Sequence, residues 1–198
     1  MLNSFNRYYN MNRLFSLIKS LRFIFHIFVF YRSPLRKTVL EYERDRWLEL
    51  NHFAKKGLSG FLLLLNVFPE YRSLFYHRTG TTWLSFFAKG QTNLYFHTPQ
   101  EKIGRGLVLW HAYATVINAQ SVGCDCQIWH LVTLGKKDIS PNENRPIIGD
   151  NVSICTGAVV IGDVQIGDNS LIGANSVANK SVPKNCVAVG TPIQIINK

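Results

Sequence analysis

An aliphatic residue returns at every sixth position through much of the second half of the chain. The clearest run comprises Ile148, Ile154, Val160, Ile166 and Ile172. A small or β-branched residue follows each of them four places later. A fixed six-residue period is typical of a parallel β-helix, because each coil has an apolar edge that only the neighbouring coil can bury. The pattern therefore predicts a solenoid with a continuous aliphatic column.

The repeat has two irregularities. Towards the N-terminus the same step continues through Leu134, Ile128, Val122 and Val116. One extra residue separates Val116 from the hexad that begins at Leu109. Between Leu134 and Ile148 the pattern is interrupted by residues 136–146, a polar segment that contains two prolines. Loops on rigid scaffolds commonly carry functional sites, so we expect residues 136–146 to protrude and to take part in one.

The chain before the hexads has a different character. Helical spacing and glycine or proline breaks predict short helices over residues 35–56, 60–68, 70–78 and 82–89, with Gly57 as a C-cap. At Thr98 and Pro99 the helical spacing disappears and the hexads begin. We therefore expect a helical domain over residues 1–95 and a β-helix domain over residues 96–198. By content, such a chain is α+β.

Residues 14–31 form the most apolar stretch. Its uncharged run, residues 23–31, is far below the ~20 residues that a helix needs to cross a bilayer. No small-residue cleavage site follows to mark a secretory signal. Two interpretations remain: a helix buried against another helix or subunit, or an interfacial helix whose basic residues face lipid headgroups. Seven basic and no acidic residues precede Leu40, which keeps the second interpretation open.

The whole chain is basic, with a formal net charge of +10. Such a charge suits nucleic acid, an anionic membrane surface or phosphorylated ligands. We rank nucleic acid last and expect none as a partner, because the charge is concentrated in an apolar segment. The four cysteines lie in the repeat region without the spacing of a metal finger. We interpret them as packing residues of a reduced, cytoplasmic protein.

Two histidines are distinguished by their spacing. His111 follows Leu109 and Trp110, and His130 follows Ile128 and Trp129, 19 positions later. If a coil comprises three hexads, or 18 residues, the inserted residue accounts for the spacing of 19. The segments 109–111 and 128–130 then lie above one another on adjacent coils, ~4.8 Å apart. A neutral imidazole removes a proton from a hydroxyl near neutral pH, so the histidines are candidates for a base.

Less reactive roles for these histidines stay open. Each can equally be a surface or packing residue. A metal site would need a third ligand, and His97, the only other histidine nearby, does not fit a hexad. We therefore expect no metal.

Small residues in the later hexads suggest a surface for a long phosphorylated ligand. Ala158, Ala174 and Ser176 would permit close approach, and Lys180 would meet a phosphate. The alternative is that tight coil corners simply require small residues.

Taken together, these motifs resemble the hexapeptide-repeat acyltransferases. Within that family the chain is similar to the serine acetyltransferase-like branch, which also contains O-acetyltransferases of capsule and exopolysaccharide synthesis. The likeness is carried by residues 103–111, 132–135, 146–152, 172–177 and 182–192. It implies a left-handed β-helix, assembled as a homotrimer or a dimer of trimers. It also implies acetyl-CoA as the donor substrate.

The resemblance also assigns roles to residues. His111 matches the general base, which deprotonates an acceptor hydroxyl for direct attack on the acetyl thioester. The residues that match contacts to CoA are Ala158, Ala174, Ser176 and Lys180.

The chain departs from serine acetyltransferases where they meet their acceptor. Trp110 and Phe96 stand at positions of two aspartates, and Asn144 with Arg145 stands for an Arg-His pair. Arg145 would still bind a carboxylate, and Asn144 and His130 are further candidates for contact with the acceptor.

We therefore expect a sugar hydroxyl in polysaccharide biosynthesis as the acceptor, with serine as the alternative. A carboxylate that orients His111 is expected from Glu101 or from the helical domain. A non-catalytic β-helix scaffold, peripheral to the inner face of the membrane through residues 14–31, is the alternative of another class.

Overall fold

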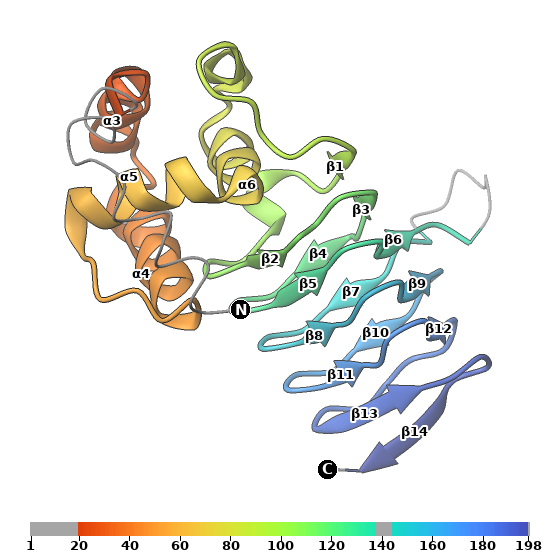
Figure 1. Ribbon diagram of the computed structural model, residues 1–198. Coiled ribbons are helices and arrows are strands. Elements are labelled where there is room, and N and C mark those ends of the chain that lie inside the picture. Colours follow the sequence, from red (N-terminus) through yellow and green to blue (C-terminus); the bar gives the residue numbers. More distant parts are fainter. Residues whose placement is uncertain (1–19, 138–143, 198) are drawn as a thin grey trace.

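In the computed structural model, helices cover one end of a stack of short strands (Figure 1). The structure describes residues 20–137 and 144–197. Part of the apolar stretch 14–31 and most of the loop at 136–146 therefore lie outside the described residues. Among the described residues, no helix is long and apolar enough to cross a membrane.

Three sheets run along the stack. The first contains β1 (Leu94–Phe96), β3 (Thr115–Ile117), β6 (Thr133–Gly135), β9 (Val159–Ile161) and β12 (Val177–Ala178). The second contains β4 (Ser121–Val122), β7 (Ile147–Ile148) and β10 (Gln165–Ile166). The third contains β2 (Val108–Trp110), β5 (Gln127–Trp129), β8 (Ser153–Ile154), β11 (Leu171–Ile172), β13 (Cys186–Val189) and β14 (Gln194–Asn197).

From β1 to β13 successive strands along the chain belong to different sheets, because the chain coils from one face to the next. Neighbouring coils pair in parallel, and only β14 runs antiparallel, against β13. In the third sheet the register places Leu109 over Ile128, Ile154 and Ile172, and all four side chains are buried. The aliphatic column predicted from the period of six is therefore confirmed, since these side chains point into the solenoid.

One member of the predicted column is wrong. Ile117, rather than Val116, pairs with Leu134 and is fully buried, while Val116 is half-buried. Eight positions separate Leu109 from Ile117, and five separate Ile117 from Val122. The first corner thus has two extra residues and the next has one fewer. The two changes leave a net insertion of one, which is all that counting in the sequence detects.

The helices are α3 (Ile24–Arg32), η1 (Arg36–Leu40), α4 (Glu41–Leu50), α5 (Gly57–Val67), α6 (Pro69–Thr79), η2 (Thr82–Phe86) and η3 (Gln100–Lys102). The helix expected over residues 35–56 is shorter and ends at Leu50. Gly57 is the first residue of α5 rather than a C-cap. Gly80 does end α6 in the left-handed conformation, with φ of 67°, which glycine adopts without steric strain.

The helical part is fastened to the first coil by buried polar contacts. The Trp47 indole donates a hydrogen bond to the Leu107 carbonyl at 2.9 Å. Arg78 donates to the carbonyls of Ile103 and Gly104, both at 2.6 Å, and forms a buried ion pair with Glu43. One apolar core runs through both parts. The domain boundary at residue 95 stays a prediction, and β1 spans it.

Candidate active site

His111 lies on the corner that carries the two extra residues. It directly follows β2, adopts a left-handed conformation with φ of 52°, and is exposed. The Tyr113 amide donates to the His111 carbonyl at 2.6 Å, which closes a tight turn. The insertion therefore lifts this imidazole out of the regular coil and presents it to solvent.

The predicted stacking of the segments 109–111 and 128–130 is confirmed for the backbone of the two strands. Trp110 pairs with Trp129, and their rings stack with centroids 6.1 Å apart. The ring that packs on His130 is that of Tyr113, at 5.1 Å, because the longer first corner shifts the side chains that follow His111. The His130 Nδ1 atom is buried without a hydrogen-bond partner among the described residues.

Glu70 supplies a carboxylate near His111 that sequence reasoning did not identify. It is the second residue of α6, a helix that packs on β2, and only 6% of its surface is exposed. Burial raises the pKa of the Glu70 carboxyl group, while the charges of His111 and Arg72 act in the opposite direction. Within the described residues Glu70 forms no ion pair. A backbone hydrogen bond also lowers the pKa of Glu70, and His111 is the first charged group after it to do so.

Glu101, the other carboxylate considered for His111, lies elsewhere. It lies exposed on η3, and its charge acts on His77 instead. In the sequence Glu70 is an acidic residue in the first turn of a helix, where it would usually be read as favouring the helix dipole. Only the packing of α6 on β2 distinguishes it.

The two positions that depart from serine acetyltransferases are occupied by packed aromatic rings. The Trp110 indole donates to the Gln127 side-chain oxygen at 2.9 Å. Phe96 stacks on His77 with ring centroids 4.4 Å apart. Burial is the main cause that lowers the pKa of His77. The two positions that carry aspartates in serine acetyltransferases are thus occupied here by uncharged aromatic side chains.

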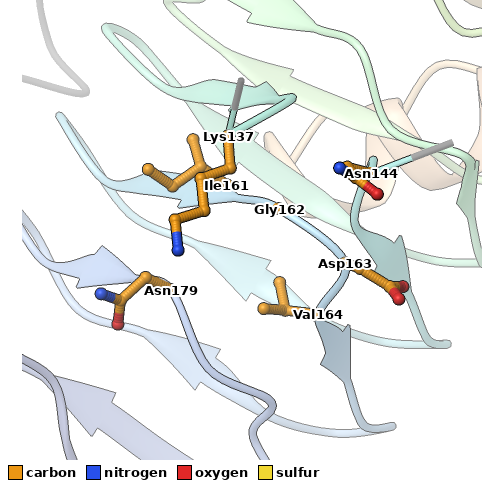
Figure 2. Close-up of a pocket in the computed structure, with 7 residues that line it drawn as sticks. All are labelled: Lys137, Asn144, Ile161, Gly162, Asp163, Val164 and Asn179. Atoms are coloured by element: carbon orange, nitrogen blue, oxygen red, sulfur yellow. The ribbon is translucent and has the colours of Figure 1, made fainter. Parts of the chain in front are cut away.

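A pocket of about 350 Å³ lies where the loop leaves the coils (Figure 2). Its lining residues are Lys137, Asn144, Ile161, Gly162, Asp163, Val164 and Asn179. Lys137 and Asn144 come from the two described ends of the loop, and a site there stays a prediction. Arg145 is half-buried and lies 3.5 Å from the Asn118 side-chain oxygen, to which it donates.

The four residues matched to CoA contacts fall into two groups. Ala174 and Lys180 are exposed. Lys180 directly follows Asn179, which lines the pocket. Ala158 and Ser176 are fully buried. The Ser176 hydroxyl accepts a hydrogen bond from the Gly190 amide at 2.9 Å. For Ala158 and Ser176 the alternative interpretation fits better: a tight corner requires a small residue, and neither side chain offers a surface to a ligand.

The cysteines are unpaired thiols, and Cys126 and Cys186 are buried. Burial raises the pKa of the Cys126 thiol to about 12, which suits a packing residue. In the described part of the chain no three His, Cys, Asp or Glu side chains are close enough to hold a metal ion.

Comparison with known proteins places these features in a family context. The family model described as bacterial transferase hexapeptide (six repeats) matches residues 145–180. The serine acetyltransferase of Mycobacterium tuberculosis is 42% identical over 101 residues, which is 50% of this chain and 44% of that protein. The enzyme of Synechococcus elongatus is 32% identical over 156 residues, or 72% and 62%. The enzyme of Helicobacter pylori is 37% identical over 116 residues, or 58% and 67%.

The chain spans about half the length of most of the curated relatives it matches. Among solved structures, the serine acetyltransferase of Neisseria gonorrhoeae matches with a TM-score of 0.63 at 27% identity, covering 80% of this chain and 63% of that one. The Brucella abortus enzyme in complex with coenzyme A matches with a TM-score of 0.58 at 25% identity, covering 86% and 71%. Together with the parallel pairing of neighbouring coils in all three sheets, these likenesses confirm the expected left-handed β-helix with helices at its N-terminal end.

Proposed function

Because this chain belongs to the serine acetyltransferase family of hexapeptide-repeat transferases, we propose that it transfers the acetyl group of acetyl-CoA to the hydroxyl of L-serine. The observation that carries this proposal is the exposed imidazole of His111 on a corner built by two extra residues. Relatives between 32% and 42% identical are serine acetyltransferases, so serine replaces the sugar hydroxyl that the sequence favoured as acceptor.

His111 would act as the general base. Its neutral imidazole takes the hydroxyl proton of serine while the oxygen attacks the carbonyl carbon of the thioester. The tetrahedral intermediate collapses as the carbon–sulfur bond breaks. The departing thiolate takes the proton back from His111, so that O-acetylserine and CoA leave with His111 neutral again.

Glu70 would be a positioning residue for His111. When the imidazole accepts a proton it becomes a cation, and the carboxylate of Glu70 offsets that charge. Because Glu70 is buried, water screens this interaction weakly. The raised pKa of Glu70 reflects the cost of holding a carboxylate there, and a protonated His111 reduces that cost.

Acetyl-CoA would lie along the coils beside the loop. Lys180 is exposed and carries the charge that a phosphate requires, and Ala174 leaves room beside it. The pocket lined by Lys137 and Asn144 adds a second place where the cofactor contacts the chain. Arg145 and His130 remain the proposed contacts to the acceptor. A homotrimer or a dimer of trimers in the cytoplasm completes the proposal, and light scattering of the purified chain tests the assembly.

A sugar hydroxyl is the second candidate acceptor. The observation that favours it is the stack of Trp110 on Trp129 next to His111. Aromatic ring faces pack well against the apolar faces of sugar rings, whereas an amino acid ammonium group is better met by a carboxylate.

The test is release of CoA from acetyl-CoA in the presence of L-serine or of nucleotide-linked and lipid-linked sugars. We expect turnover with serine and a loss of about 10²–10⁴-fold in kcat for His111→Ala. The matched control is His52→Asn, because His52 is exposed on the turn that follows α4. Turnover with sugars alone would select the second candidate. Equal rates for His111→Ala and the control would refute the assignment of the base, and no release with any acceptor would favour the scaffold alternative.

A further inference from the structure

Helix α3 is apolar on two sides. Phe23, His26 and Phe30 face the core, as expected for a helix packed on its neighbours. The residues Leu21, Ile24, Phe25, Phe28 and Tyr31 are exposed at helical spacing. Phe28 alone leaves 64% of its surface in water. Exposing such a stripe to water is costly, so it is the mark of a surface that binds a partner or a membrane.

The stripe continues onto η2. Phe25 contacts Trp83 and Phe87, with ring centroids 6.0 and 5.0 Å away. Trp83 is exposed, and Phe86 is 88% exposed. We call the combined surface the aromatic face; it comprises Leu21, Ile24, Phe25, Phe28, Tyr31, Trp83 and Phe86. It lies in the helical part, at the end of the molecule opposite the C-terminal coil (Figure 1).

The chain segments that carry the aromatic face are rich in basic residues. Residues 1–40 and 71–100 contain no Asp or Glu. Arg22, Arg32, Lys37 and Lys89 are exposed in these segments. The Arg36 guanidinium lies 4.5 Å above the Tyr31 ring and pairs with Glu41 just outside the first segment. Exposed apolar rings are thus bordered mainly by cations, of which Arg36 is paired with a carboxylate.

We propose that the aromatic face binds the surface of an anionic lipid bilayer. Phenylalanine and tryptophan rings bury well at the boundary between acyl chains and headgroups, and basic residues beside them attract anionic lipids. Each Lys or Arg near such a surface strengthens binding through its attraction to the anionic headgroups, and salt weakens that attraction. The inference goes beyond acetyl transfer and does not depend on it.

A second copy of this chain is a poorer occupant. Symmetric pairing of two aromatic faces places the same patch against itself. The exposed cations Arg22, Arg32, Lys37 and Lys89 would then lie close to their counterparts on the other copy, and such like-charge contacts are unfavourable. An anionic bilayer satisfies the apolar rings and the cations together.

The test is sedimentation of the full chain with 100 nm vesicles of phosphatidylcholine, with and without about 30% phosphatidylglycerol. We expect binding to the anionic vesicles at least about tenfold tighter than to the neutral ones, and weaker binding in 0.5 M NaCl. The double variant Phe28→Gln with Phe86→Gln should lose about tenfold in affinity, since two rings no longer leave water. Its matched control is Ile196→Gln, which changes an exposed apolar residue on β14.

Trp83 offers a second readout, because its emission should shift to the blue on binding and the shift should be absent in Trp83→Phe. Equal vesicle affinity of the double variant and the Ile196→Gln control would overturn the proposal. The proposal would also be overturned if the parent chain failed to bind vesicles and the double variant formed a smaller assembly than the parent chain in light scattering. That result would identify a second copy as the occupant.

Discussion

Acid should destabilise this protein through one buried imidazole. His26 is fully buried, and its Nε2 atom lies 2.8 Å from the Tyr76 hydroxyl oxygen. That hydroxyl donates its only proton to the Ala88 carbonyl, at 2.6 Å. His26 must therefore donate through Nε2, which leaves Nδ1 as a bare acceptor with no partner among the described residues.

Protonation would place a charge on that partnerless atom. Burial, followed by the charges of Arg72 and Arg22, lowers the pKa of His26 to about 4 from an ordinary 6.5. The folded state thus binds this proton less readily than the unfolded state. Stability is complete above about pH 7.5 and is lost as the pH falls from about 6.5 towards 4. The loss at pH 5 amounts to about 2 kcal/mol, and its limit in stronger acid is about 3 kcal/mol.

Urea unfolding followed by circular dichroism at pH 7.5 and pH 5.0 measures this loss. His26→Phe keeps a ring among the aromatic neighbours Phe23 and Phe75 and removes the titrating group. Between the two pH values the parent chain should lose about 2 kcal/mol more than His26→Phe does. Other groups, including His77, contribute equally to both proteins and cancel. The exposed His52 provides the control, since His52→Asn should behave as the parent. The reasoning is refuted if His26→Phe and the parent chain lose the same free energy on acidification.

Four further outcomes follow from named contacts. Arg78→Leu should lower the free energy of unfolding by about 3–5 kcal/mol, measured in urea, because it leaves Glu43 buried and uncompensated; a loss below 1 kcal/mol would contradict this. Glu70→Gln should lower kcat by about tenfold or more with little change in KM for serine, and an unchanged kcat would remove its positioning role. Lys180→Gln should raise KM for acetyl-CoA several-fold without lowering kcat, and a fall in kcat alone would argue against phosphate contact. Gly157→Ala should lower the melting temperature, because a Cβ would lie 2.2 Å from the Asn175 side-chain oxygen and φ is 70°; an unchanged melting temperature would show that the corner relaxes.

Some parts of the site followed from spacing alone. The 19 positions between His111 and His130 predicted that their strands pair, and the register of Trp110 on Trp129 confirms it. Other parts did not. Ala158 and Ser176 match a motif but lie inside the coil, because a small residue at a corner serves packing as well as it serves a ligand. Spacing cannot separate these two uses.

The apolar segment near the N-terminus shows the same limit. Its sequence left burial and lipid contact open. In the described residues 20–31 one side is buried and another side is apolar and exposed, and we propose that the exposed side contacts lipid. A helix places residues three and four apart on one side, so the residues on each side can be predicted from the sequence. Which side meets other helices depends on how α3 packs, and that is a tertiary property.

The period of six by itself determined the β-helix, since every coil must bury the same aliphatic position against its neighbours. Tertiary structure alone decided the two features on which the proposed chemistry depends. The length of the corner beside His111 could not be read from the sequence. That corner has two extra residues and the next has one fewer, so the sequence shows only a net insertion of one. Glu70 precedes His111 by 41 positions, and no local pattern links them. They come together only because α6 packs across β2 when the helical part closes over the first coil.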